Sequence, residues 1–278
     1  MRRGDFLNHS ITDSIKSLPP LSKTIIDINT LYADSEASII DLLKVIERDP
    51  MIVANLLKAA NSPLYGFSKK IRNASQAVSL FGMSMTRSIA ISNAVRKLLN
   101  VDMQPYGVTS EKFAETSELQ ATLMMNWYKQ IDKSKAEKLY LATFLQETGK
   151  ILIANSIIQE DETTAFYSEI ELSNNIAQVE KMYVDITSSE LSSQIFEHWN
   201  FDEEFVAMIK YADNPQSAPE TIKEFATALN IVKSIVPVNK PLSETAINIG
   251  LKKASDAGYN HELLEDAIDD ILDTLEIN

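Results

Sequence analysis

The sequence contains no cysteine, only three histidines and only seven glycines among its 278 residues. Without cysteine, the chain has no disulfide, thiolate zinc site, iron–sulfur cluster or cysteine nucleophile. The scarcity of glycine disfavours phosphate sites built from backbone loops, and folds rich in tight turns. These absences exclude several large classes of metalloprotein and hydrolase.

The three histidines are His9, His198 and His261, and none belongs to an H-x-x-x-H or E-x-x-H pair. Such spacing is what directs two side chains from one helical face to one ion. A D-x-D-x-D-G calcium loop is also missing. We therefore expect no metal site, no cofactor and no catalytic residues.

Basic residues are outnumbered, at 26 against 39 acidic residues, which gives a net charge of −13. This balance disfavours nucleic acid as a partner, because binding it requires lysine and arginine to displace counterions. Uninterrupted apolar runs such as 139–142 are far too short to span a bilayer, and the N-terminus lacks the apolar core of a signal peptide. We expect a cytoplasmic protein without membrane contact.

The spacing of apolar residues is helical throughout, as in Leu21, Ile25 and Ile28. Asp49 before Pro50 is typical of a helix start, since aspartate accepts from free amides and proline suits the first turn. No segment shows convincing strand alternation, so the sequence predicts an all-α protein. Later helices are expected near 84–99, 110–131, 135–156, 160–172, 175–182, 187–199, 202–213, 219–236, 241–256 and 260–275.

Motifs for phosphate binding and nucleophilic catalysis are incomplete. Gly149-Lys150 would end a phosphate loop, but Phe144 occupies the position of its first glycine. Gly82 to Thr86 lacks the second glycine of a serine-nucleophile turn. Spacing alone therefore reveals no catalytic constellation.

One short basic loop follows two aromatic residues and could contact an anionic ligand or a partner. The alternative is an ordinary solvated loop whose polar residues cap a helix and form a turn. Its candidate residues are Asn61, Ser62, Tyr65, Gly66, Lys69, Lys70 and Arg72.

An ordered set of short motifs resembles the first lobe of the HDOD domain family. It comprises LPPL at 18–21, DP at 49–50, LLKAANS at 56–62, YG at 65–66 and LFG at 80–82. The resemblance continues at 142–152 (ATFLQETGKIL) and 188–199 (SSELSSQIFEHW), and covers roughly residues 12–215.

The resemblance implies a two-lobed helical domain, in which an N-terminal helix bundle packs on a lobe like that of HD-type metal phosphohydrolases. We expect an N-terminal lobe over 1–105, an HD-like lobe over 106–215 and a helical extension over 216–278 that packs on the HD-like lobe.

The same resemblance locates the residues that replace the family's metal ligands. The histidine–aspartate pair aligns with Gln146 and Glu147, a later histidine with Ser188, and a pair of histidines with Ala212 and Asp213; the first histidine aligns near Thr116. One carboxylate beside an amide cannot hold two metals. Gln146 and Glu147 form either a buried polar pair or a pocket that still binds a small ligand.

The resemblance implies a non-catalytic bacterial signalling module that acts through protein–protein interaction with signalling proteins of unknown identity. No receiver, cyclase or kinase pattern accompanies it, so we expect its input in trans or through a ligand. A divergent phosphohydrolase or phosphodiesterase, a nucleotide-binding sensor using the former HD pocket, and a nucleic-acid regulator remain as alternatives.

Overall fold

The computed structural model describes residues 11–34, 36–65, 70–99 and 102–276, and within them every regular element is a helix. This confirms the predicted all-α fold. The α-helices are α2 (Lys23–Ala33), α3 (Ile39–Ile46), α4 (Pro50–Ala60), α5 (Ala74–Leu99), α6 (Ser110–Tyr128), α7 (Lys133–Leu145), α8 (Gly149–Gln159), α9 (Thr163–Leu172), α10 (Ile176–Val184), α11 (Ser188–His198), α12 (Glu203–Lys210), α13 (Glu220–Ile235), α14 (Glu244–Asp256) and α15 (His261–Glu276). Three short 3-10 helices are η1 (Pro63–Tyr65), η2 (Gln104–Tyr106) and η3 (Pro215–Ser217).

Helix starts follow the capping residues in the sequence. The carboxylate of Asp49 accepts from the amides of Met51 and Ile52, and Pro50 occupies the first position of α4, as predicted. Ser38 and Asp41 form a complete capping box at the start of α3. Local chemistry therefore sets where these helices begin.

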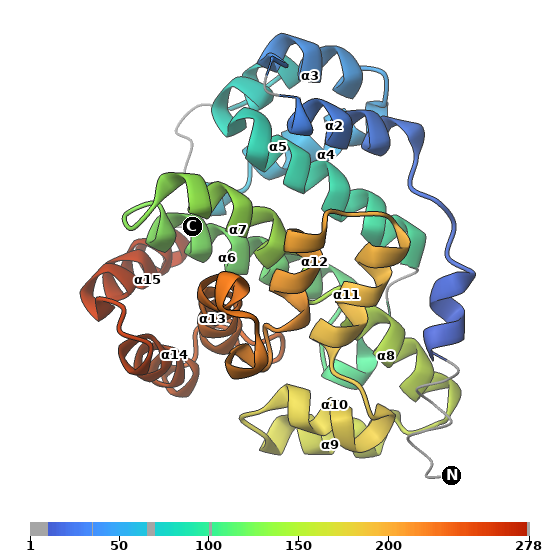
Figure 1. Ribbon diagram of the computed structural model, residues 1–278, viewed down its shortest axis with the longest axis vertical. Coiled ribbons are helices and arrows are strands. Elements are labelled where there is room, and N and C mark those ends of the chain that lie inside the picture. Colours follow the sequence, from blue (N-terminus) through green and yellow to red (C-terminus); the bar gives the residue numbers. More distant parts are fainter. Residues whose placement is uncertain (1–10, 35, 66–69, 100–101, 277–278) are drawn as a thin grey trace.

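The N-terminal lobe consists of α2 to α5, and α5 connects it to the rest of the molecule. In Figure 1, α5 runs from this lobe toward the centre, where it packs against α7. The helix changes direction at Gly82, whose backbone has φ 69° and ψ −173°. Glycine tolerates this left-handed conformation, which is why the sequence predicts an interruption here.

The second lobe is built around α6 and α7, with α11 packed between α8 and α12. The last three helices cover this lobe, since α13 contacts α6, α7 and α12 while α15 contacts α6. The two-lobed architecture is therefore confirmed, whereas the division at residues 105 and 215 stays a prediction.

The single helix expected over 135–156 is wrong, because the chain forms α7 and α8 with a turn between them. Thr148 Oγ1 donates to the carbonyl of Leu145, and the amide of Gly149 donates to Ser192 Oγ in α11. A Cβ at position 149 would overlap the carbonyl of Ser188. The turn thus allows α8 to approach α11 closely.

The segment before α2 lies against the end of α11. Trp199 Nε1 donates to the carbonyl of Pro19 at 3.0 Å, and His198 Nε2 lies 3.4 Å from the carbonyl of Leu18. In the described residues, no helix combines the length and apolar character that crossing a bilayer requires.

Candidate functional site

The second lobe encloses a group of buried charged side chains, which we call the charge cluster. It consists of three carboxylates and two ammonium groups, from Glu147, Glu180, Asp213, Lys150 and Lys233. Each of these side chains is at most 11% exposed. Glu147 and Lys150 flank the start of α8, Glu180 lies in α10, Asp213 follows α12 and Lys233 lies in α13.

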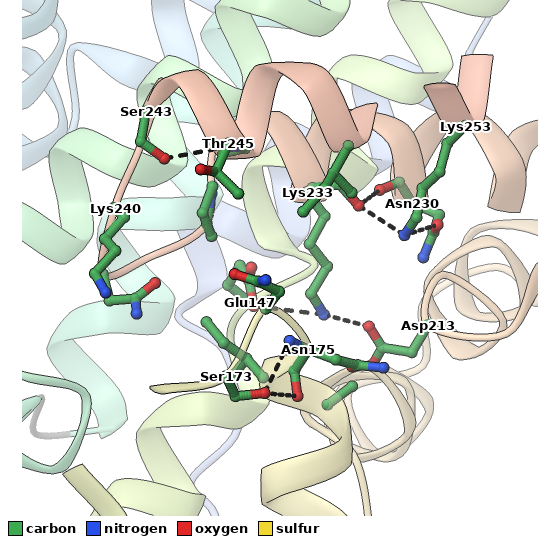
Figure 2. Close-up of a pocket in the computed structure, with 18 of the residues that line it drawn as sticks. Glu147, Ser173, Asn175, Asp213, Asn230, Lys233, Lys240, Ser243, Thr245 and Lys253 are labelled. Carbon is green, nitrogen blue, oxygen red and sulfur yellow. Dashed lines mark hydrogen bonds and ion pairs between the residues drawn. The ribbon is translucent and has the colours of Figure 1, made fainter. Parts of the chain in front are cut away.

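Each lysine bridges two carboxylates. Lys150 Nζ contacts Glu180 and lies 3.2 Å from Glu147 Oε2. Lys233 Nζ lies 2.8 Å from Asp213 Oδ1 and 3.6 Å from Glu147 Oε2. Glu147 therefore stands between the two ammonium groups, and Figure 2 shows Lys233 reaching from α13 toward Glu147 and Asp213.

The beginning of α11 provides hydrogen-bond donors to the same carboxylates. The amide of Ser188 donates to Glu180 Oε2 at 2.6 Å, and that of Ser189 donates to Asp213 Oδ2 at 3.3 Å. The positive end of a helix dipole favours carboxylates at this position. Ser188 Oγ also accepts from Lys150 Nζ at 3.0 Å.

The pKa shifts follow from these contacts. Burial raises the pKa of Glu147, but Lys150 and Lys233 outweigh burial and hold that pKa below its usual value. Burial also works to raise the pKa of Asp213, which the ammonium of Lys233 nevertheless keeps well below its usual range. Burial lowers the pKa of Lys233, and the neighbouring carboxylates raise it further than burial lowers it. These shifts favour the ionised forms of Glu147, Asp213 and Lys233.

A buried amide chain extends the cluster toward α6. Gln146 Nε2 donates to Gln120 Oε1 at 2.9 Å, and Gln120 Nε2 donates to Glu147 Oε1 at 3.2 Å and to the carbonyl of Val236 at 2.8 Å. On the opposite side, the hydroxyl of Tyr106 donates to Glu180 Oε1 at 3.0 Å. The carboxylates are thus held by donors from several elements.

These residues do not fit a metal centre. Divalent cations need several carboxylate or imidazole ligands that converge on one point. Here the carboxylates converge on ammonium groups, and the described residues include no group of three or more histidine, cysteine, aspartate or glutamate side chains able to hold an ion. The positive charge at this position comes from Lys150 and Lys233.

The structure brings together most of the positions that the sequence aligns with metal ligands. Gln146, Glu147, Ser188 and Asp213 all lie in or beside the charge cluster. Ala212 is buried beside them, and its carbonyl accepts from Asn230 Nδ2 at 2.6 Å.

Thr116 does not join this group, since its hydroxyl donates to the carbonyl of Lys112 in its own helix. Gln120, one turn further along α6, is the residue that contacts the cluster.

Four members of the site were not predicted from the sequence: Gln120, Glu180, Lys233 and Tyr106. Lys150 was considered only as part of a phosphate loop. The sequence contains one signal of this site, since Lys150 is the single charged residue in the largely apolar segment that forms α8. In the structure this side chain is fully buried. A lysine in that position requires a buried counter-charge.

The predicted basic loop lies elsewhere in the molecule. Asn61 ties the loop to the end of α4, because its side chain donates to the carbonyls of Leu57 and Ile71 and accepts from the amide of Ile71. Ser62 Oγ accepts from the amide of Leu64, so both residues have a structural role.

The remaining loop candidates are only partly described. The hydroxyl of Tyr65 lies 3.1 Å from that of Tyr140 in α7. Lys70 and Arg72 line a shallow, open depression with Asn61. Gly66 and Lys69 lie outside the described residues. A ligand or partner role for this loop stays a prediction.

A cavity of about 410 Å³ opens beside the charge cluster. Its walls come from the cluster, the start of α10 with the loop before it, α13, α14 and the loop between α13 and α14 (Figure 2). Glu147, Lys150, Asp213 and Lys233 form one side of this cavity, and of these Asp213 and Lys233 are the more exposed, at 10% and 11%.

Comparisons with known proteins agree with this architecture. The HDOD domain pattern matches residues 18–215. A curated protein from Treponema pallidum (strain Nichols), described as uncharacterized, is 23% identical over 217 residues, which is 77% of this chain and 41% of that protein. This chain thus spans less than half the length of that relative.

Two solved structures share the fold. One, from Marinobacter aquaeolei VT8, is provisionally described as a signal transduction protein; it is 20% identical with a TM-score of 0.73, over 99% of this chain and 64% of that one. The other, from Shewanella amazonensis SB2B, is provisionally described as a phosphohydrolase; it is 18% identical with a TM-score of 0.69, over 92% of both chains. With the domain pattern covering most of its residues, the chain belongs to the HDOD domain family.

Proposed function

We propose that this chain is a regulatory module that acts by binding and not by catalysis. The observation that carries the proposal is the pair of buried ammonium groups, Lys150 and Lys233, between the carboxylates of the charge cluster. The HDOD family membership and the description of the Marinobacter structure as a signal transduction protein support a regulatory role.

The chemistry of an ammonium group supports a non-catalytic role for this site. A catalytic metal polarises a phosphoryl oxygen and lowers the pKa of a bound water to create a nucleophile. An ammonium group supplies positive charge but cannot coordinate and ionise water in this way. Its three protons are already directed to acceptors, which for Lys150 are Glu180 and Ser188, with Glu147 as a further ion-pair partner.

The proposed output is a change in how the lobes pack, which exposes an apolar surface to a signalling protein. Three large apolar side chains of the N-terminal lobe are already exposed in this conformation and provide a candidate surface for first contact with that protein. Ile26 in α2, Ile40 in α3 and Met51 in α4 are 51%, 65% and 57% exposed.

The first experiment tests for catalysis. Purified protein is analysed for bound metal, and hydrolysis of cyclic dinucleotides and phosphomonoesters is measured with added manganese or magnesium. We expect no stoichiometric metal and no turnover. Turnover that disappears in Glu147→Gln and Asp213→Asn variants would show that the charge cluster is a catalytic site and that the proposed non-catalytic function is wrong.

The second experiment tests for a partner. The wild-type chain and an Ile40→Asp variant are used to capture proteins from lysate of the source cells. A partner that binds the wild type and loses affinity for the variant supports the proposed output. Equal recovery with both proteins would argue against this surface, and recovery with neither would argue against regulation by protein contact.

A further inference from the structure

The cavity beside the charge cluster contains most of the elements of an anion site. Four lysines line it, although the whole chain carries 13 more acidic than basic side chains. Lys150 and Lys233 belong to the cluster, and Lys240 lies 3.4 Å from Glu171. The fourth is Lys253 in α14.

Lys253 differs from the other three in its partners. Its Nζ donates to Asn230 Oδ1 at 2.7 Å and to Ser234 Oγ at 2.8 Å, and no described carboxylate lies within 4.0 Å of it. Two uncharged acceptors thus hold this ammonium at the wall of the cavity, as Figure 2 shows for Asn230. Burial, together with the charge of Lys233, lowers the pKa of Lys253, while Asp213 opposes that change. A bound anion would supply the missing counter-charge.

Two helix N-termini also face the cavity. Asn175 caps α10 and Ser243 caps α14, and the residues that follow each cap are among those lining the space. Free amides and the positive end of the helix dipole favour an anion at such positions. Thr245 adds a hydroxyl from the first turn of α14.

The cavity is larger than a simple oxyanion needs. Its volume of about 410 Å³ lies in the range typical of small-molecule sites, roughly 300–1,000 Å³. Part of the lining is apolar, from Ile176, Ala177, Pro237, Ala246 and Ile249. A ligand here therefore has an organic body as well as a charged group.

From these observations we infer that the cavity between α10, α13 and α14 binds a small phosphomonoester, with its phosphate on Lys253 and its organic body on the apolar lining. This inference rests on the proposed function, because it names the class of signal that the regulatory module receives. Most of the lining residues lie in α13, in α14 or in the loop between them, beyond the segment that the HDOD domain pattern matches.

The test measures binding to the purified full chain by titration calorimetry. The probes are AMP, GMP, glucose 6-phosphate and inorganic phosphate. Lys253→Met is compared with Lys252→Met, because Lys252 is the exposed neighbour on the same helix. Circular dichroism confirms that both variants are folded.

We expect at least one organic phosphate to bind more tightly than inorganic phosphate. Lys253→Met should weaken that binding at least about tenfold, since charge-assisted hydrogen bonds are among the stronger polar contacts. Lys252→Met should leave it within about twofold of the wild type. This combination supports the inference.

Three results would overturn it. The first is that no organic phosphate binds at about 10 mM, a concentration sufficient to detect even a millimolar Kd. The second is that Lys253→Met and Lys252→Met lose the same affinity for the organic phosphate. The third is that inorganic phosphate binds as tightly as the organic probes. Phosphate release is measured in the same samples. Release of phosphate from a bound probe would refute the proposed non-catalytic function but not the phosphomonoester site. If the chain captures a protein partner but binds no organic phosphate, only the phosphomonoester site is refuted.

Discussion

Individual residues of the charge cluster depend on one another for their charge. Glu147 has both lysines within ion-pair distance, and Asp213 pairs with Lys233. Removing one partner from a buried pair leaves an uncompensated charge, and this is more costly than removing the whole pair. Lys233 is the residue at which this dependence is easiest to test.

We expect Lys233→Met to lower the free energy of unfolding by about 3–5 kcal/mol, as for other broken buried pairs. The double variant Lys233→Met/Asp213→Leu should recover part of this loss, because the second change removes one of the stranded carboxylates. Urea denaturation measures both values, and exposed Lys252→Met is the control. A loss no greater than that of the control would mean that the ion pairs contribute little to stability.

The lowered pKa values of Glu147 and Asp213 determine the direction of the pH dependence. The unfolded chain takes up protons on these carboxylates near their ordinary pKa values of about 4, while the folded chain does not. Stability contributed by the cluster is therefore complete above this pH and is lost as pH falls through the folded pKa values.

We expect the free energy of unfolding to decrease progressively from about pH 5 downward. Asp213→Asn should make this acid slope shallower, because one of the carboxylates with a depressed pKa is gone. Urea denaturation at a series of pH values measures the slopes. An unchanged or steeper slope in the variant would exclude Asp213 as a contributor.

At the scale of the helices, the close approach of α8 and α11 fixes the geometry of the site. The amide of Gly149 donates to Ser192 Oγ, and a Cβ at this position would overlap the carbonyl of Ser188 and crowd the amide of Ser192. The overlapping atoms are backbone atoms of a packed helix, so they cannot rotate away.

Gly149→Ala should therefore destabilise the protein by about 1–3 kcal/mol, the usual cost of overpacking. The sign of the change in unfolding free energy is informative, because a Gly→Ala substitution at an open position in a helix stabilises a protein by about 0.5–1 kcal/mol. Thermal or urea unfolding gives the value. A stabilised variant would show that α8 and α11 separate easily.

Sequence reasoning predicted most elements but only part of the site. Helical spacing and caps such as Asp49 are local signals, so they identify elements from short windows. The break between α7 and α8 was missed because it depends on the contact of Gly149 with α11, 43 residues further along the chain. Lys233 and Glu180 were missed for the same reason, since only folding brings them to Glu147 and Lys150.

At the scale of the whole molecule, α5 links the two lobes. It packs on α3 and α4 in the first lobe and on α7 in the second, and Ser84 Oγ donates to the carbonyl of Glu137 across this junction at 3.0 Å. The segment before α2 adds a second connection through Trp199 and Pro19. The lobes are therefore mechanically coupled.

We expect this coupling to make unfolding a single transition. Circular dichroism reports all helices, whereas tryptophan fluorescence reports only Trp127 and Trp199, both outside the first lobe. Urea curves from the two probes should have the same midpoint. Separate midpoints would mean that the lobes unfold independently.

The position of Lys233 has a consequence for how relatives of this chain are classified. The segment that identifies the family ends at residue 215, yet the cation that balances Glu147 and Asp213 comes from α13. A relative that keeps these two carboxylates but has an uncharged residue at the position of Lys233 must neutralise the carboxylates in another way. The charge balance of this site is thus decided partly by a residue outside the segment that defines membership, and comparing relatives at that position of α13 would show which of them share these ion pairs.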